Sequence, residues 1–457
     1  MAGDLRVAVV GSGPAGFYAA SGLLAADAEV DLIDRLPTPW GLVRLGVAPD
    51  HPNIKAVSRA FEKIARGEGF RFLGNVEVGR DISHDELTGL YDAVVYAYGA
   101  AGDRRLGIPG EDLPGSWAAT ELVAWYNGHP DFQALDFDLS AERAVVIGNG
   151  NVALDVARML ALTEEELAST DTTDEAIAAI AGSGIREIVV LGRRGPVQAA
   201  WTPTELAELG ELAGADVIVP QAELVLDAAS RAELEAADHI VKRNLEVLAD
   251  FAGREPAGKR RRVVLRFRTS PVAILGDDHV EGVELARNEL EPDGRGSVRA
   301  VSTEEHEEHD ELDCRLVFRS VGYRADPLFG TPFDPRTATM RNDGGRVLGE
   351  HDALLTGVYC AGWIKRGPTG VIGTNKKDAA ETVELLLADA DAGVIGGRGA
   401  SPDAIDALLA ERGVEVVTQA GWEAIDETER ARGEPLGRPR VKLTAWDELL
   451  AAARGAN

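Results

Sequence analysis

Two glycine-rich segments of the chain have the residue types and spacing of phosphate-binding turns. They are Gly11–Gly16 (GSGPAG) and Gly148–Ala153 (GNGNVA), and each lies between an apolar run and a helix-like run. The first glycine of such a turn permits a tight bend, the second lets a pyrophosphate approach the backbone, and the third position lets helix pack on strand. The helix that follows directs unpaired N–H groups at the phosphates. Two dinucleotide sites are therefore predicted. Their glycine contacts are Gly11, Gly13, Gly16, Gly148 and Gly150.

The residues after the second strand of each predicted unit carry opposite charges. Asp34 lies 23 residues after Gly11, where a carboxylate binds ribose hydroxyls. The second unit has Arg193 and Arg194 at this place, and guanidinium groups bind a 2′-phosphate through charge-assisted, often bidentate bonds. The first unit is thus predicted to hold a nucleotide with a free ribose, and the second NADP(H). A surface aspartate and a solvated arginine pair are the alternatives.

A third glycine-rich segment, Gly362–Gly373 (GWIKRGPTGVIG), lies just ahead of a predicted helix. The N-terminus of that helix can stabilise negative charge on a reduced flavin ring, and Trp363 could cover the ring face. The alternative is a loop that packs Trp363 in the core. No CxxC follows either glycine turn, so the chain has no redox-active dithiol and its electrons are expected to leave for an external acceptor.

Several polar residues could serve the reaction or a partner. His51, Glu205 and Glu208 are candidates near a nicotinamide, because a reduced flavin takes up a proton, although a plain surface role is open for each. A basic stripe is expected on one face of a helix over residues 53–66, where it could dock an acidic partner or be solvated. Its members are Lys55, Arg59, Lys63 and Arg66. His306 and His309 lie in an acidic stretch that favours a solvated loop, so no metal site is predicted.

Composition limits the function classes. The 457-residue chain has a formal net charge of −29, which argues against nucleic-acid binding. No apolar run approaches the ~20 residues of a membrane helix, and the N-terminus leads directly into a strand, so no signal peptide is expected. Two cysteines, Cys314 and Cys360, cannot make an iron–sulfur site or a disulfide framework. A cytoplasmic location is expected.

The elements that must position these residues form two strand–glycine–helix units about 137 residues apart. Such units predict two similar α/β lobes with parallel sheets. Predicted strands cover residues 5–10, 29–34, 70–73, 75–78, 91–99, 144–147, 188–191, 316–321 and 358–361. A predicted helix follows each glycine turn, to about Ala26 and to about Leu160, and further helices are predicted over residues 53–66, 163–180 and 375–388. The last sixty or so residues are polar and give no clear prediction.

Five segments together resemble the adrenodoxin-reductase-type ferredoxin–NADP⁺ reductases over nearly the whole chain. They are VVGSGPAGFYAA, PTPWGLVRLGVAPDHPNIK, GNGNVALDVAR, LGRRGP and GWIKRGPTGVIGTNKKDA. The resemblance implies non-covalent FAD at Ala15, Asp34, Gly41, Leu42, Val78, Trp363, Gly370, Val371 and Ile372. It implies NADP(H) at Asn149, Gly150, Asn151, Val152, Arg193, Arg194, Glu205 and Gly370. It also implies His51 and Glu208 near the flavin–nicotinamide contact, an aromatic role for Trp40 in the flavin loop, and a basic partner surface near Lys242 and Arg243.

The predicted fold is α/β, with two Rossmann-like dinucleotide-binding domains and the NADP domain (104–324) inserted into an FAD domain made of 1–103 and 325–457. The predicted function is hydride transfer from NADPH to FAD, followed by single-electron transfer to a ferredoxin or similar small iron–sulfur protein. A monomer is expected. An NADPH-dependent flavin oxidase, monooxygenase or quinone reductase is the alternative enzyme, and a catalytically silent nucleotide-sensing protein is the alternative of a different class.

Overall fold

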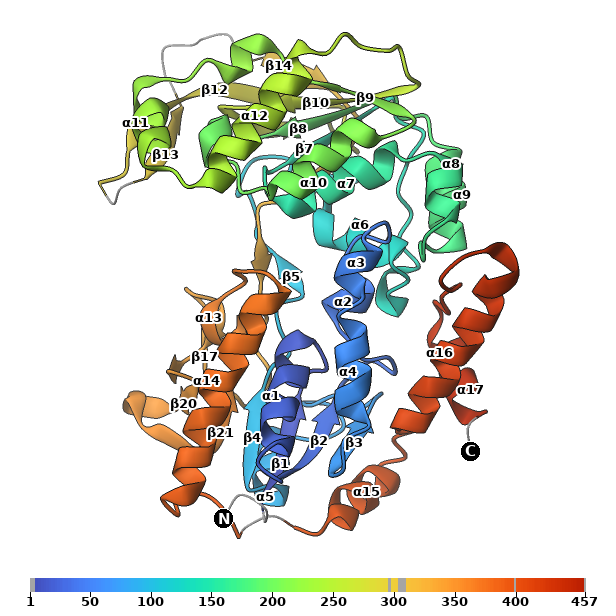
Figure 1. Ribbon diagram of the computed structural model, residues 1–457, viewed down its shortest axis with the longest axis vertical. Coiled ribbons are helices and arrows are strands. Elements are labelled where there is room, and N and C mark those ends of the chain that lie inside the picture. Colours follow the sequence, from blue (N-terminus) through green and yellow to red (C-terminus); the bar gives the residue numbers. More distant parts are fainter. Residues whose placement is uncertain (1–4, 295–296, 303–309, 398–399, 456–457) are drawn as a thin grey trace. The chain divides into compact units, whose positions relative to one another are not determined.

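The chain forms two units in the computed structural model, which describes residues 5–294, 297–302, 310–397 and 400–455 (Figure 1). Unit 1 comprises Met1–Gly102, Asn127–Pro130 and Tyr323–Asn457, and unit 2 comprises Asp103–Tyr126 and Asp131–Gly322. The predictions for His306 and His309 lie outside the described residues. Within the described ranges, no helix is long and apolar enough to cross a membrane.

Unit 1 is built on a seven-stranded sheet with the order β19-β20-β21-β4-β1-β2-β3. The strands are β1 Arg6–Val10, β2 Glu29–Ile33, β3 Phe70–Leu73, β4 Ala93–Tyr96, β19 Asn342–Asp343, β20 Arg346–Leu348 and β21 Leu354–Cys360. Strands β21, β4, β1, β2 and β3 run parallel, whereas β19 and β20 are antiparallel additions at one edge. Every residue of β1 is buried, as expected for a strand covered on both faces.

Helices cover the unit 1 sheet because successive residues of its strands point to opposite faces. Val7 and Val9 belong to a core with α1 (Pro14–Leu24) and α14 (Ile372–Asp391), whereas Ala8 and Val10 belong to a core on the other face. Gly22 lets α1 and α14 pack closely, since a Cβ there would lie 3.2 Å from a Val383 methyl carbon. The α1 N-terminus, which follows the first glycine turn, is fixed by this packing.

Unit 2 contains a six-stranded parallel sheet and a smaller antiparallel sheet. The parallel sheet has the order β6 (Ser116–Ala118), β15 (Leu316–Arg319), β7 (Arg143–Ile147), β8 (Glu187–Leu191), β10 (Arg261–Arg266) and β9 (Ala215–Ile218). The antiparallel sheet is formed by β11 (Thr269–Leu275), β12 (Gly282–Pro292), β13 (Val298–Ser302) and β14 (Asp310–Asp313). The second glycine turn joins β7 to α7 (Asn151–Ala161).

Three of the predicted elements differ in the structure. Residues 75–78 are not a strand, because Asn75 has a left-handed backbone (φ 58°) that breaks the extended run. The helix predicted over 53–66 is two helices, α3 (Pro52–Lys55) and α4 (Ser58–Ala65), since the backbone between them makes i→i+3 bonds. The basic stripe is therefore not one helix face. The insertion over 163–180 is also two helices, α8 (Glu164–Ala168) and α9 (Asp174–Ala181).

The C-terminal segment, for which the sequence gives no clear prediction, folds into three helices of unit 1. They are α15 (Pro402–Glu411), α16 (Gln419–Gly433) and α17 (Trp446–Arg454). Each buries a few apolar side chains at helical spacing, such as Trp422 and Ile425 on α16. These apolar residues are sparse in a polar stretch, which is why their periodicity is weak in the sequence.

Candidate dinucleotide sites

The first glycine turn has the geometry of a phosphate cradle. Gly11 has φ +106°, and a Cβ there would lie 2.6 Å from the Tyr98 Cα atom. A Cβ on Gly16 would collide with the Gly11 carbonyl oxygen. Gly13, the N-cap of α1, has no heavy atom within 4 Å of the place where a Cβ would stand. Two glycines are thus required by close packing, and the third leaves open space at the helix N-terminus that fits a pyrophosphate.

Asp34 lies against this turn at the end of β2. Its Oδ2 accepts hydrogen bonds from the Ser12 N–H (2.8 Å) and the Ser12 hydroxyl (2.6 Å), and its Oδ1 accepts from the Leu36 N–H (2.9 Å). These bonds fix the carboxylate: Oδ2 accepts two of them, and Oδ1 accepts one and keeps a further acceptor site for a ligand hydroxyl. The Val76 N–H donates to the Asp34 carbonyl oxygen (2.9 Å), which places the segment leading to buried Val78 beside the same strand end.

The loop over residues 37–47, called the flavin loop below, lies against the first glycine turn. The Trp40 N–H donates to the Ser12 carbonyl oxygen (2.9 Å), and a Cβ on Gly41 would lie 3.0 Å from the Gly13 Cα. Leu42, which begins α2 (Leu42–Leu45), is 37% exposed. A large apolar side chain left exposed beside an open phosphate cradle fits a cofactor that would cover it.

The third glycine segment also reaches this turn. A Cβ on Gly362 would lie 2.6 Å from the Ala15 Cβ, so the end of β21 packs against the start of α1. Trp363 is half-buried, its ring centroid is 5.0 Å from that of Tyr323, and its indole N–H donates to the Thr369 carbonyl oxygen (3.2 Å). Gly370 (φ +80°), Val371 and Ile372 lead into α14, and Val371 is 64% exposed.

A buried polar cluster at the start of α14 was not predicted from the sequence. Asp378 accepts from the Gly362 N–H and forms an ion pair with Lys365 (Nζ–Oδ1 3.2 Å). Asn375 accepts from the Arg366 guanidinium (3.1 Å). Asn375 and Asp378 are both buried. The sequence signal that could have indicated this cluster is the pair of polar residues at i and i+3 on the buried face of the helix, because buried polar groups must find hydrogen-bond partners.

The second glycine turn repeats the geometry of the first in unit 2. Gly148 has φ +141°, and a Cβ there would collide with the Ser320 carbonyl oxygen. Gly150, the N-cap of α7, has no heavy atom within 4 Å of its Cβ position. The buried side-chain nitrogen of Asn149 has no hydrogen-bond partner among the described residues. A donor left without a partner beside an open helix N-terminus fits a bound acceptor such as a phosphate oxygen.

Arg193 and Arg194 follow β8 and form no ion pair within 4 Å among the residues described. Arg193 is exposed and Arg194 is half-buried. Burial, and then the charge of Arg193, lower the pKa of Arg194 below its usual value. The turn is fixed by its backbone, since the Asn288 amide donates to the Arg193 carbonyl oxygen (2.8 Å). Glu233 and Asp293 act on Arg194 only through longer-range attraction, so two guanidinium groups that repel each other, with no carboxylate within 4 Å in the described part of the chain, are suited to a phosphate dianion.

The remaining predicted polar residues are divided between the units. Glu205 and Glu208 lie on α10 (Pro203–Glu208) of unit 2, which is tied to the second glycine turn by a hydrogen bond from the Thr202 N–H to the Asn151 side chain (3.0 Å). The Glu208 carboxylate is 3.9 Å from the Arg158 guanidinium. His51 is buried at the N-cap of α3 in unit 1.

Neither cysteine is placed for redox or nucleophilic chemistry among the residues that the structure describes. Cys314 and Cys360 are free and buried, and burial raises the pKa of each thiol to about 12. Both therefore stay protonated and unreactive at neutral pH. Among the residues that the structure covers, no group of three or more His, Cys, Asp or Glu side chains could hold a metal ion.

The fold and the two glycine turns define a class of proteins with two dinucleotide-binding units. Residues 5–190 match the family model of pyridine nucleotide-disulphide oxidoreductases. NADPH-ferredoxin reductase FprA of Mycobacterium tuberculosis is 51% identical over 461 residues, covering 98% of this chain and 99% of that protein. Mitochondrial NADPH:adrenodoxin oxidoreductase of Arabidopsis thaliana is 43% identical, covering 98% and 95%. The solved structure of M. tuberculosis FprA in complex with NADPH superposes with a TM-score of 0.93 at 50% identity, covering 99% and 100%. The chain belongs to the NADPH-ferredoxin reductase family of oxidoreductases. The predicted resemblance and fold class are thereby confirmed.

Proposed function

We propose that this chain carries reducing equivalents from NADPH through FAD to a ferredoxin. The observation that carries the proposal is the opposite charge beside two otherwise similar turns. Asp34 stands next to the open glycine turn of unit 1, and Arg193 and Arg194 follow the corresponding strand of unit 2. A carboxylate accepts hydrogen bonds from a free ribose and would repel a 2′-phosphate, whereas the two guanidinium groups attract a 2′-phosphate. The names of the full-length relatives support the same assignment.

FAD is assigned to unit 1. The open space at Gly13, the carboxylate of Asp34 and the exposed side chains of Leu42 and Val371 support a bound dinucleotide with an apolar ring system. The proposed contacts are Gly11, Gly13, Ala15, Gly16, Asp34, Gly41, Leu42, Val78, Trp363, Gly370, Val371 and Ile372. When bound, FAD supplies the exchange between two-electron and one-electron chemistry.

NADP(H) is assigned to unit 2. The open helix N-terminus at Gly150 would hold its pyrophosphate, and Arg193 and Arg194 would hold its 2′-phosphate. The proposed contacts in unit 2 are Gly148, Asn149, Gly150, Asn151, Val152, Arg193, Arg194 and Glu205. His51 and Glu208 are proposed as the polar groups near the reacting rings. His51 is buried, at 7% exposed, at the N-cap of α3.

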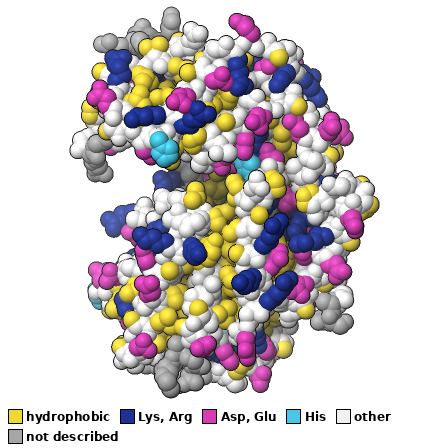
Figure 2. All heavy atoms as spheres, in the orientation of Figure 1, with side chains coloured by type: hydrophobic (Ala, Val, Ile, Leu, Met, Phe, Trp, Pro, Cys, Tyr) yellow, Lys and Arg dark blue, Asp and Glu magenta, His cyan; other side chains and the backbone are white. Residues whose placement is uncertain are grey.

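The acceptor is proposed to be a ferredoxin, a small iron–sulfur protein. Lys376 and Lys377 are exposed in the second turn of α14, close in sequence to the proposed flavin contacts. Figure 2 shows Lys and Arg side chains lying among Asp and Glu side chains over the visible face. Local basic residues on a chain of net charge −29 would steer an acidic partner to one place instead of attracting anions everywhere. Monomeric state and cytoplasmic location stay predictions.

An anaerobic titration tests the function. The purified protein should be yellow, and NADPH should bleach its flavin absorbance near stoichiometry. Cytochrome c should then be reduced rapidly only when a ferredoxin is added. Rapid oxygen or quinone consumption without ferredoxin would instead identify an oxidase or quinone reductase. A protein that binds both nucleotides without bleaching would contradict every enzymatic assignment.

A further inference from the structure

The flavin loop is held in a conformation that its own sequence does not favour. Trp40 has φ 84° and Gly41 has φ 50°, so two successive residues have positive φ. A non-glycine residue with such a backbone persists only where its surroundings hold it. The loop forms a wall of the space beside Gly13, because a Cβ on Gly41 would lie 3.0 Å from the Gly13 Cα. Whatever holds the loop therefore also shapes the proposed FAD site.

The C-terminal segment supplies those surroundings through a buried cluster of charges. Glu429 of α16 is fully buried and forms two hydrogen bonds with the guanidinium of Arg44 in the flavin loop, at 2.5 and 2.9 Å. Its Oε2 also accepts from Arg440 (3.1 Å), and its Oε1 accepts from the Leu443 N–H (2.9 Å). One carboxylate thus joins the loop to two points of the chain beyond α16. Burial alone would raise the pKa of Glu429, but the charges of and hydrogen bonds from Arg44 and Arg440 outweigh it and hold that pKa below its usual value.

Aromatic contacts interlock the same two segments. The Trp40 and Trp422 rings meet edge to face with centroids 4.9 Å apart. The Arg44 guanidinium lies 5.3 Å from the Trp422 ring centroid, and the Arg440 guanidinium lies 5.9 Å from that of Trp40. Each segment therefore places an arginine over a tryptophan of the other, a favourable cation–π arrangement. Glu429 lies between the two arginines and pairs with both.

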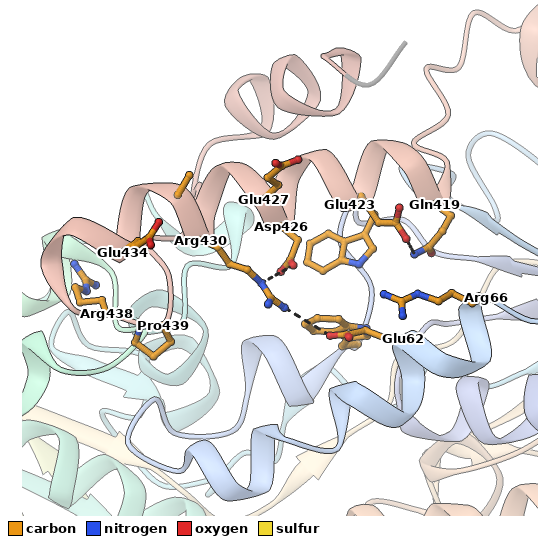
Figure 3. Close-up of a pocket in the computed structure, with 13 residues that line it drawn as sticks. Glu62, Arg66, Gln419, Glu423, Asp426, Glu427, Arg430, Glu434, Arg438 and Pro439 are labelled. Carbon is orange, nitrogen blue, oxygen red and sulfur yellow. Dashed lines mark hydrogen bonds and ion pairs between the residues drawn. The ribbon is translucent and has the colours of Figure 1, made fainter.

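The outer side of this contact is not filled by packing. A cavity of about 730 Å³ opens between α4 and α16 and is lined by Trp40 and Trp422. Figure 3 shows charged side chains around it, with Arg430 bonded to Asp426 and reaching Glu62 of α4. Trp40 and Trp422 are nevertheless buried, at 5% and 3% exposed, so their packing and the ionic contacts of Glu429 fix the loop together.

We propose that Glu429 is a positioning residue for the flavin: by pairing with Arg44 and Arg440 it fixes the flavin loop against the first glycine turn and thereby sets FAD affinity. The inference rests on the proposed function, since it takes unit 1 to be the FAD site. The C-terminal helices are then part of the cofactor site, although Glu429 itself is 385 residues from Arg44 in the chain.

The test uses the full-length holoenzyme and the variant Glu429→Gln, which keeps the side-chain shape and removes the charge. Loss of a charge-assisted contact should raise the FAD dissociation constant about ten- to a hundredfold. The loosened loop should also shift the visible absorption maxima of the remaining bound flavin. The KM for NADPH should stay unchanged, because Arg193 and Arg194 lie in unit 2.

Two control variants separate positioning from general instability. Glu427→Gln makes the same chemical change two residues away at an exposed position of α16 and should leave FAD affinity unchanged. Ile425→Val makes a small cavity at a buried position of the same helix; it should lower the melting temperature of the apoprotein without shifting the flavin spectrum. If Glu429→Gln does not fold, as judged by circular dichroism, the same measurements are made on Arg44→Lys. This variant keeps the positive charge at residue 44 and the negative charge of Glu429, but it loses the bidentate hydrogen bonding between them.

The outcomes distinguish this inference from the proposed function. The positioning role would be overturned if a folded Glu429→Gln variant kept the FAD affinity and the flavin spectrum of the wild type. If that variant does not fold, the same result in Arg44→Lys would overturn it. Either result would leave the reductase activity in place. Equal effects in Ile425→Val would also overturn it, because the loss would then follow stability alone. A wild-type protein that binds no FAD at all would overturn the proposed function first.

Discussion

Neutralising the arginine pair is the sharpest perturbation of the proposed NADPH site. Arg193→Gln and Arg194→Gln each remove one positive charge from the turn after β8. Losing a charge-assisted hydrogen bond costs about 1.5–3 kcal/mol, which corresponds to roughly a ten- to hundredfold weaker binding of NADPH. Arg194 is half-buried and Arg193 is exposed, so screening by water and salt should make the Arg194→Gln effect the larger one.

The structure adds a second expectation about the ligand-free protein. Neither arginine has a carboxylate within 4 Å among the described residues, and the charge of Arg193 lowers the pKa of Arg194. Removing one charge therefore breaks no ion pair; it relieves the repulsion between the two arginines and, for Arg194, loses a smaller attraction to Glu233 and Asp293. The free energy of unfolding of the ligand-free variants should change by no more than about 0.5 kcal/mol. The loss of NADPH affinity should thus appear without a loss of stability.

Steady-state kinetics with NADPH and NADH, using ferricyanide as acceptor, measure the effect. The KM for NADPH should rise in both variants while kinetics with NADH stay constant, because NADH has no 2′-phosphate. Arg243→Gln is the matched control, since Arg243 is an exposed arginine of unit 2 paired with Glu246. An equal loss with both coenzymes would refute the assignment of the pair to the 2′-phosphate.

Three further predictions follow from the contacts in unit 1. Gly16→Ala should give protein without flavin, seen as loss of visible absorbance, because its Cβ would meet the Gly11 carbonyl oxygen; a yellow variant with normal FAD content would contradict the turn geometry. Asp34→Asn should weaken FAD binding about tenfold or more in fluorescence titrations, since the charged acceptor beside Ser12 is lost; unchanged affinity would remove Asp34 from the ribose site. The pKa of Glu429 is held below its usual value, so its stabilisation is fully present above the unfolded-state pKa of about 4.3 and is lost only as the pH falls further, through the lower folded-state pKa. In urea unfolding, the difference in stability between the wild type and Glu429→Gln should therefore stay nearly constant from about pH 7 down to about pH 5 and should narrow only at lower pH, towards the folded-state pKa; a difference that vanishes by about pH 4 would contradict the lowered pKa of Glu429.

Much of the two dinucleotide units could be predicted because their signals are local. A buried parallel strand reads as a short apolar run, and the glycines that follow are required by contacts within the same strand–turn–helix unit, as at Gly11 and Gly16. The strand-end charges of Asp34 and Arg194 are local too, since each follows its strand directly. The helix break at residues 56–57 was missed because no glycine or proline marks it, whereas Asn75 was missed although Gly74 precedes it and asparagine tolerates a left-handed backbone.

The sequence by itself determined the two glycine turns and the charge that follows the second strand of each unit, because spacing along one strand, turn and helix is fixed by backbone geometry. Only the tertiary structure decided what supports those turns. It buries Glu429 between Arg44 and Arg440 and places Asp378 under Gly362. Such pairs join residues far apart in the chain, and a glutamate in a polar helix has the same sequence signature whether it is solvated or buried. Burial and partner are properties of the packed fold, so only the folded chain distinguishes them.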